Sequence, residues 1–187
     1  MPLAENALTT VDKIRLPIDP VETEPLINTA SDIIERHCNT KFNKKQRTKL
    51  FRPVGQMYLT VPFWNLETVS QILHDGEEIT EYTVLQEEGM IYKNDHWPDS
   101  RDYDLEITLT AGFTLPKDDS DSTPRDLPRG IEHACILLTS QLHYQMKRDL
   151  SVSDRSLPDV SESYFKNEGK LPGAVRNLLS PWRVSPV

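Results

Sequence analysis

The sequence predicts an α+β protein, a small helical bundle interrupted by an antiparallel β insertion. Apolar residues recur every three or four positions in two long segments, 19–38 and 129–148, which is the period of an amphipathic helix. Between them, over residues 50–114, apolar residues alternate with polar ones, which is the period of half-buried strands. The first and last helices are too short to be stable alone, so we expect them to pack on the 129–148 helix.

The first helix is expected over residues 19–38. The run Asp19-Pro20-Val21-Glu22 resembles a capping box, with proline at the first helical position. Pro25 would cost a hydrogen bond inside the helix, so Thr23 is an alternative cap that places Pro25 in the first turn. The apolar face consists of Leu26, Ile27, Ala30, Ile33, Ile34, His37 and Cys38.

The β insertion is expected to contain four or five antiparallel strands. Asp75-Gly76 is a dipeptide typical of a tight hairpin turn, and Glu87-Glu88-Gly89 separates two further short apolar runs. Leu105, Ile107 and Leu109 alternate with polar residues, which predicts a half-buried strand. The strands are expected at 57–61, 69–73, 82–85, 90–92 and 105–110.

The C-terminal third begins with a polar, proline-punctuated linker, residues 115–128. The helix 129–148 follows, and its apolar stripe is Ile131, Ala134, Cys135, Leu138, Leu142 and Met146. Residues 149–170 lose this period and predict a mobile loop, and a short helix is expected at 172–180. The expected organisation is an N-terminal arm at 1–18, a single domain at 19–183 and a C-terminal tail at 184–187.

The composition indicates a thin core under a large polar surface. Of 187 residues, 37% are apolar, and the formal net charge is -8. Even with the 7 glycines the apolar share stays below the roughly 45–50% typical of a globular domain, which favours a subunit completed by copies or partners. No apolar run approaches the roughly 18 residues of a membrane span, and no secretory signal is visible. We therefore expect a soluble cytoplasmic assembly with no membrane partner.

The cysteines and histidines offer no metal-binding pattern. Cys38 and Cys135 each fall on an apolar helix stripe, which favours two buried free thiols over a disulfide. No H-E-x-x-H or C-x-x-C motif is present, and no two histidines stand four residues apart on a helix. The five histidines are therefore interpreted as ordinary core or surface residues, and no metal or cofactor is expected.

No catalytic motif is visible either. The neighbouring pairs Cys135–His133 and Cys38–His37 point in different directions on a helix, so neither can form a nucleophilic dyad. The G-x-S-x-G, G-x-G-x-x-G and Walker motifs are absent, and the carboxylates are expected in solvated stretches. We expect a protein that is not an enzyme, with a hydrolase built on an unrecognised carboxylate pair as the remaining catalytic hypothesis.

Charge is strongly segregated along the chain. Residues 75–106 contain eleven acidic residues against Lys93 and Arg101, and residues 36–52 contain seven basic residues and no acidic one. The basic segment, with Phe42 and Phe51, could contact nucleic acid, or it could be a solvated loop. A third hypothesis is that a basic and an acidic edge meet head-to-tail between subunits, which can close a ring. The basic residues are Arg36, Lys41, Lys44, Lys45, Arg47, Lys49 and Arg52.

Several strings, taken in their order and spacing, resemble the head–tail connector (head completion, adaptor) proteins of long-tailed bacteriophages. None of them is a catalytic signature. Members known for a purely helical core would lack the β insertion, so the chain resembles the subset that has one. The strings are 25–35, 69–76, 109–113, 127–134, 160–164, 171–175 and 178–183.

The resemblance implies a ring of about a dozen subunits below the portal protein. Such a ring extends the DNA channel, through which DNA passes without sequence-specific contacts, and offers a platform for a stopper or tail-completion protein. It implies a place in the virion, at the head–tail neck, after assembly in the host cytoplasm. A DNA-binding accessory protein using residues 36–52 is the alternative.

The resemblance also implies that the C-terminal segment reaches the portal protein. Tryptophan and arginine often anchor interfaces, but Trp182 could equally cover the end of the domain. The residues that match the family's motif there are Leu178, Leu179, Pro181, Trp182 and Arg183.

Overall fold

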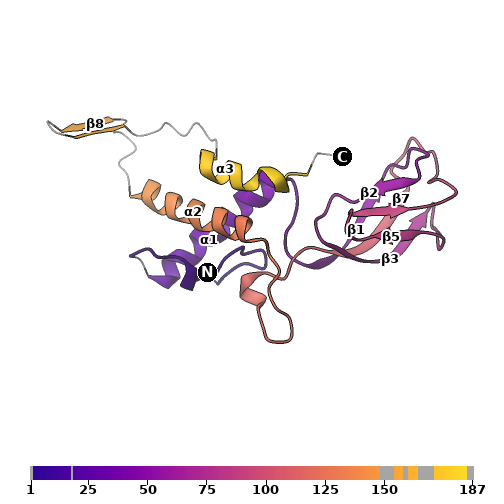
Figure 1. Ribbon diagram of the computed structural model, residues 1–187, viewed down its shortest axis with the longest axis horizontal. Helices are drawn as coiled ribbons and strands as arrows, with labels where there is room; N and C mark the ends of the chain where they lie inside the picture. Colours follow the sequence, from indigo (N-terminus) through magenta and orange to yellow (C-terminus); the bar gives the residue numbers. More distant parts are fainter. Residues whose placement is uncertain (1, 18, 148–153, 158–159, 164–170, 185–187) are drawn as a thin grey trace. The chain divides into compact units, whose positions relative to one another are not determined.

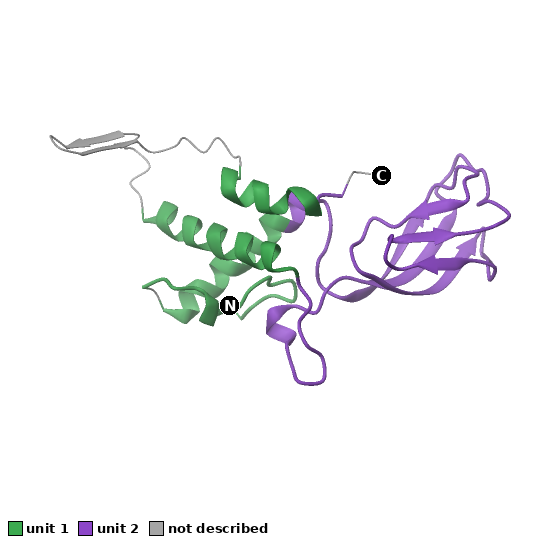
Figure 2. Ribbon diagram, viewed as in Figure 1, with its two compact units in different colours: residues 1–34, 128–182 green, residues 35–127, 183–187 purple. Residues whose placement is uncertain are grey.

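The computed structural model describes residues 2–17, 19–147, 154–157, 160–163 and 171–184. The chain divides into two compact units (Figure 2). Residues 1–34 and 128–182 form a helical unit, and residues 35–127 and 183–187 form a β unit. None of the helices in the described ranges is long and apolar enough to cross a membrane.

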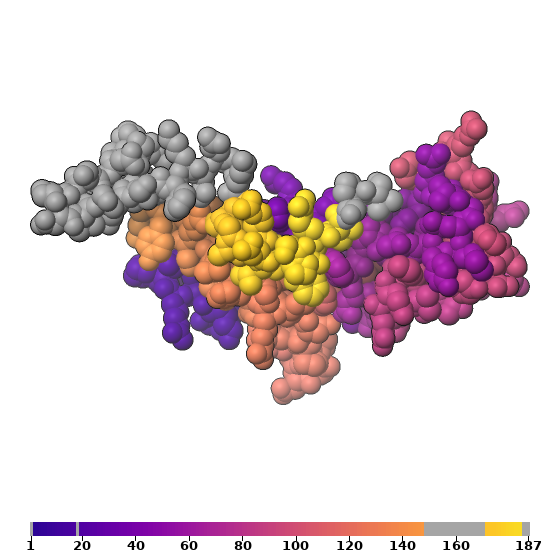
Figure 3. Space-filling view, turned by 45° about the horizontal axis from the view of Figure 1, so that its top comes forward, coloured from indigo at the N-terminus to yellow at the C-terminus, as the bar shows by residue number. Residues whose placement is uncertain are grey.

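Among the described residues, the helical unit contains α1 (Pro20–Cys38), α2 (Arg129–Met146) and α3 (Gly173–Leu179), with α1 continuing into the β unit from Glu35 (Figure 1). Two short 3₁₀ turns, η1 (Val11–Lys13) and η3 (Ser180–Trp182), also belong to it. Figure 3 shows α3, in yellow, at the surface of this unit. The apolar interior consists of Ala7, Leu8, Ile27, Ala30, Ile34, Ile131, Ala134, Cys135, Leu138, Val175 and Leu179.

Asp19 caps the N-terminus of α1, as the capping pattern predicts. Its Oδ1 accepts a hydrogen bond from the Val21 amide at 2.8 Å, and its carbonyl accepts from the amides of Glu22 and Thr23. Thr23 is therefore not the cap, and its hydroxyl donates to the Asp19 carbonyl at 3.1 Å. Pro25 is accommodated inside the helix.

The N-terminal arm packs into the helical unit. Ala7 and Leu8 are fully buried. The Ala4 amide donates to Asn28 Oδ1 at 2.8 Å, and the Leu8 amide donates to Ser31 Oγ at 3.1 Å. These are side-chain acceptors on α1, so the arm needs no periodic sequence of its own to be held in place.

The stripe of α2 ends one turn earlier than the sequence predicts. Leu138 and His143 are buried, whereas Leu142 is half-buried and Met146 is 77% exposed. Met146 is the last helical residue, so only part of the predicted stripe has neighbours to pack against.

The β unit consists of two antiparallel sheets. The first has four strands in the order β1-β7-β3-β4, and the second has three in the order β2-β6-β5. Together with the helices they confirm the α+β class. The strands are β1 (Lys45–Phe51), β2 (Tyr58–Thr60), β3 (Leu66–His74), β4 (Glu77–Glu78), β5 (Thr83–Leu85), β6 (Met90–Tyr92) and β7 (Leu105–Ala111).

Both predicted hairpins are confirmed. β3 and β4 pair across Asp75-Gly76, and β5 and β6 pair across residues 86–89. Asp75 and Gly76 have φ values of 51° and 84°, the left-handed conformation that a tight two-residue hairpin turn requires. The turn chemistry therefore determines the register of this hairpin locally.

The strand β1 is absent from the sequence prediction, and the interpretation of its residues as a solvated loop is wrong. It pairs with β7 along its whole length, from Lys45 opposite Ala111 to Phe51 opposite Leu105. The register puts Lys45, Arg47 and Lys49 on the core-facing side of the sheet. Cations at these positions hide the alternation of apolar residues by which a strand is recognised.

The core of the β unit is apolar throughout. The central strand β7 supplies four of its side chains at alternate positions, as its sequence predicts. The whole cluster is Phe51, Leu59, Val61, Leu66, Ile72, Ile91, Trp97, Leu105, Ile107, Leu109 and Ala111.

Two segments remain. The linker contains the 3₁₀ turn η2 (Pro116–Asp118) and the buried Leu127, and Asp126 Oδ1 accepts a hydrogen bond from the Thr114 amide. Within the predicted loop 149–170, strands β8 (Asp154–Leu157) and β9 (Val160–Ser163) pair with each other. The rest of that loop lies outside the described residues.

Candidate functional site

The basic segment begins with an ion pair that fixes the junction between α1 and β1. Lys41 Nζ lies 2.6 Å from Glu35 Oε2, and the other oxygen, Oε1, accepts the Phe42 amide at 3.2 Å. The Glu35 side chain is only 2% exposed, so a carboxylate that the sequence analysis expects in solvent is buried here. Glu132 on α2 is a second buried carboxylate. Lys41 therefore has a structural partner.

Arg47 is the most firmly held of the basic residues. Its guanidinium donates to the Ala111 carbonyl at 2.9 Å, and to the Asn43 carbonyl and Oδ1 at 2.8 and 2.6 Å. It also lies 5.4 Å from the centroid of the Phe63 ring. Burial lowers the pKa of Arg47, and the charge of Glu35 acts in the opposite direction. Arg47 thus ties the end of β7 to the chain before β1.

The remaining basic residues divide into paired and unpaired ones. Lys44 Nζ lies 2.6 Å from Glu67 Oε1, on the surface. Lys49 Nζ lies 5.8 Å from the ring centroids of both Phe51 and Phe63, so its stem covers the core while its charge stays at the edge. Arg52 Nε reaches only the Ser100 carbonyl, at 3.5 Å. Among the described residues, Arg47, Lys49 and Arg52 have no carboxylate ion pair, so the β1 edge remains cationic.

The opposite edge of the same sheet is acidic. β4 is the edge strand there, with Glu78 opposite Leu73 and Glu77 opposite His74 of β3. Asp75, Glu77, Glu78 and Glu81 are all exposed, and none has a lysine or arginine partner in the described part of the chain. We call these four residues the acidic edge and the strand β1 with Arg52 the basic edge.

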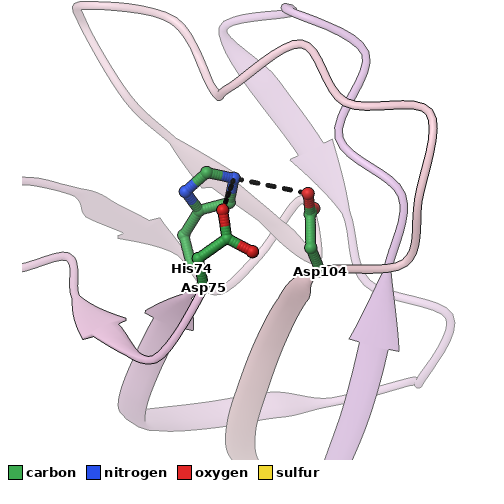
Figure 4. Close-up of side chains that lie close together, drawn as sticks. All are labelled: His74, Asp75 and Asp104. Carbon is green, nitrogen blue, oxygen red and sulfur yellow. Dashed lines mark ion pairs between the residues drawn. The ribbon is translucent and has the colours of Figure 1, made fainter.

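His74, Asp75 and Asp104 lie together at the turn of the β3–β4 hairpin (Figure 4). His74 Nε2 is 3.5 Å from Asp104 Oδ2 and 4.0 Å from Asp75 Oδ2. One imidazole nitrogen and two carboxylate oxygens form a donor set that zinc or another divalent transition metal accepts, and a protonated imidazole can pair with the same carboxylates. Pairing of His74 with Leu105 brings Asp104 to this place, which no local motif in the sequence reveals.

The five C-terminal residues expected at the portal differ in exposure. Leu179 is fully buried in the helical unit, Leu178 and Trp182 are half-buried, and Pro181 and Arg183 are exposed. Leu179 therefore supports the surface from beneath and offers no contact area of its own.

The chain after Arg183 is held by the β unit. The Val184 amide donates to the Cys38 carbonyl at 2.8 Å. Arg183 and Val184 line a cavity of about 240 Å³ together with residues of the β unit that include Phe63, Trp64 and Gln86.

The two cysteines are free and buried, as the helix stripes predict. Burial raises the pKa of each thiol to about 11. For Cys38, the charge of Arg183 acts against this rise in pKa, and for Cys135 the contact with Ser31 Oγ, 3.6 Å from the sulfur, does so. Thiols held in the protonated form are poor nucleophiles, so neither cysteine is set up for covalent chemistry.

Comparison with solved structures identifies the fold. The whole chain aligns with 94% of a chain from the neck of an empty gene transfer agent (GTA) particle, determined with C6 symmetry, at 17% identity and a TM-score of 0.63. It also aligns with 94% of a chain from the neck of a native GTA particle, determined with C12 symmetry, at 18% identity and a TM-score of 0.60. The fold is thus one found in particle necks.

The family follows from the sequence. The family model for head completion proteins matches residues 4–185, so the chain belongs to the head completion protein family. Its role is accordingly that of a head–tail connector, or adaptor, of a phage-like particle. A comparison with curated proteins found no match.

Proposed function

We propose that the chain forms a ring of about a dozen subunits that binds below the portal protein and extends the DNA channel. The ring offers its far side to a stopper or tail-completion protein, and it works without catalysis or a cofactor. Subunits are made in the host cytoplasm and end in the neck of the virion. The observation that carries this proposal is the family match over nearly the whole chain, residues 4–185.

Two further observations support a ring. The neck structures that share this fold were determined with C12 and C6 symmetry. The four-stranded sheet carries opposite charges at its two edges, and a head-to-tail contact between such edges repeats from subunit to subunit until it closes. The thin apolar composition fits a subunit whose remaining burial takes place between copies.

The basic segment gives little support to the DNA-binding alternative. Lys41 and Lys44 are paired with carboxylates, and Arg47 is bound to backbone carbonyls. A phosphate-binding patch needs several cations free to reach a neighbouring strand of nucleic acid. DNA therefore passes through the channel of the proposed ring without sequence-specific contacts.

The portal contact is proposed to involve the exposed and half-exposed C-terminal residues, Leu178, Pro181, Trp182 and Arg183. An arginine and a tryptophan on one short segment are the residue types that most often anchor an interface. Leu179 supports this surface from within the helical unit.

Co-assembly with the cognate portal protein tests the proposal. Mixed with portal rings and examined by native mass spectrometry and negative-stain imaging, the chain should form a ring of about a dozen copies on each portal. Free chain that stays monomeric is compatible with this, because docking can drive ring closure. Monomers alone in the presence of portal would contradict it. Arg183→Glu should weaken docking, whereas Arg176→Glu, an exposed change on α3, should not.

A further inference from the structure

We infer that the ring closes through the two edges of the four-stranded sheet, with the basic edge of one subunit lying against the acidic edge of the next copy. This inference rests on the proposed ring and names the surfaces that join its subunits. The partner is a second copy of this chain, and each subunit uses both edges at once.

The strand β1 is an open edge. Among the described residues it pairs with β7 on one side only, and it is the last strand of its sheet. Gln46, Thr48 and Leu50 are exposed along it, and Leu50 is 50% exposed. An edge strand of this length presents unpaired backbone donors and acceptors that a further strand can satisfy.

Strand directions permit a head-to-tail contact. Each neighbouring pair in the order β1-β7-β3-β4 is antiparallel, so β4 runs opposite to β1. A rotation by one position in a ring of about a dozen turns each strand by at most about 30°, which is too little to reverse its direction. β4 of one copy and β1 of the next therefore run in opposite senses, as an antiparallel pair requires.

Charge selects this contact over a symmetric one. Pairing β1 with β1 across a two-fold axis would bring the cations of both strands together, and like charges on facing strands are unfavourable. Pairing β1 with the acidic edge brings Lys49 and Arg52, which have no carboxylate ion pair among the described residues, to Glu77 and Glu78. Opposite charges across an interface determine which surfaces meet and in which register.

Charge also disfavours other occupants. Nucleic acid could approach the basic edge, but its phosphates would be repelled by the acidic one. A different neck protein could cover one edge and would leave the other open in every subunit. A second copy covers both, and in a closed ring it does so for all copies.

The test is a charge-reversal experiment on portal-bound rings. One variant reverses the acidic edge (Glu77→Lys with Glu78→Lys), and another reverses the basic edge (Lys49→Glu with Arg52→Glu). Each alone should need at least about tenfold more protein to form rings near physiological salt, because the contact is electrostatic. The matched controls, Asp118→Lys with Asp121→Lys and Lys93→Glu with Arg101→Glu, make the same charge changes at residues outside the two edges and should assemble normally.

Mixing the two edge variants in equal amounts should restore rings, because each reversed edge then meets a reversed partner edge. A chain that carries all four changes should also form rings. A misfolded variant could not be rescued in this way, so rescue separates loss of contact from loss of fold. Edge variants that assemble like wild type, or reversed edges without rescue, would overturn the inference and leave the ring standing. Wild-type chain that forms no ring on the portal would overturn the proposed function itself.

Discussion

The β unit and the helical unit differ in the side chains that form their interiors. The core cluster of the β unit contains only apolar and aromatic side chains, from Phe51 to Ala111. The helical unit buries polar side chains among its apolar ones, namely Thr9, Thr23, Ser31, Glu132, Thr139 and His143. Sheet ladders satisfy much of the backbone of the β unit, whose buried polar side chains, Glu35, Thr40 and Thr114, lie outside this cluster. The helical unit uses a buried side chain to hold its N-terminal arm.

Ser31 shows how the helical unit depends on such a group. Its hydroxyl donates to the Ile27 carbonyl at 2.8 Å and accepts the Leu8 amide at 3.1 Å. The Leu8 amide is buried and belongs to a segment without regular structure, so this one oxygen satisfies it. The comparison teaches that the core cluster of the β unit depends on backbone geometry and apolar volume, whereas the packing of the N-terminal arm in the helical unit depends on particular polar partners.

The largest expected effect tests the backbone of the β unit. Gly112 ends β7 with a φ of 113°, and a Cβ there would collide with the Asn43 carbonyl and lie 2.8 Å from the Lys44 amide nitrogen. Gly112→Ala should therefore lower the free energy of unfolding by about 3 kcal/mol or more. Urea unfolding followed by the fluorescence of the buried Trp97 measures this change.

Gly76→Ala is the matched control. Gly76 also has a positive φ, of 84°, but no atom lies within 4 Å of the added Cβ. Gly76→Ala should lower the free energy of unfolding by about 1 kcal/mol, because only the positive φ disfavours alanine there. Equal costs for the two substitutions would contradict the collision at Gly112.

The next expected effect concerns the reactivity of the two buried thiols, one in each unit. A thiol pKa of about 11 instead of 9.0 leaves roughly 100-fold less thiolate at pH 8, so Cys38 and Cys135 should react about 100-fold more slowly than exposed thiols. Because both pKa values are raised on folding, their contribution to stability is complete below pH 9 and is lost as the pH rises through 11.

Labelling in increasing urea, with the modified peptides identified by mass spectrometry, shows which unit opens first. Cys135 reports on the helical unit and Cys38 on the β unit. Fast labelling of either cysteine without urea would contradict its burial, and unfolding curves at pH 8 and pH 10 check the direction of the pH effect.

The smallest expected effects on the free energy of unfolding come from two buried hydroxyls in the helical unit, one with hydrogen-bond partners and one without any among the described residues. Ser31→Ala leaves the Leu8 amide without its acceptor and should cost about 1–3 kcal/mol. Thr9→Val removes a buried hydroxyl that has no hydrogen-bond partner among the described residues, so it should be neutral or stabilising by about 1 kcal/mol. Urea unfolding followed by far-ultraviolet circular dichroism compares the two. A Thr9→Val variant as damaged as Ser31→Ala would show that burial alone, and not pairing, determines the cost.

The parts of the fold that were predicted correctly are those with a local cause. The cap at Asp19, the turn at Asp75-Gly76 and the alternation along β7 each depend on neighbouring residues. The strand β1 was missed because its core-facing positions carry Lys45, Arg47 and Lys49, which only an edge strand tolerates. Its place at the edge depends on strand order, which no local pattern contains.

The candidate site also has some features that the sequence predicts and others that depend on tertiary contacts. Segregation of basic and acidic residues is visible in the sequence, and it favours a basic and an acidic edge on one subunit. The partners of those charges are not visible: Glu35 is buried against Lys41, and Asp104 reaches His74 only through the pairing of β3 with β7. The five C-terminal residues belong to one sequence motif, but their exposure differs because Leu179 faces the interior of the helical unit.

The sequence by itself determined the fold class, the two hairpins and the uneven charge of -8, because period, turn chemistry and composition are local properties. Only the tertiary structure decided that opposite charges lie at opposite edges of one sheet, that two carboxylates are buried and that the N-terminal arm belongs to a core. These features arise from contacts between residues far apart in the chain, and strand order and packing create such contacts where periodicity cannot record them.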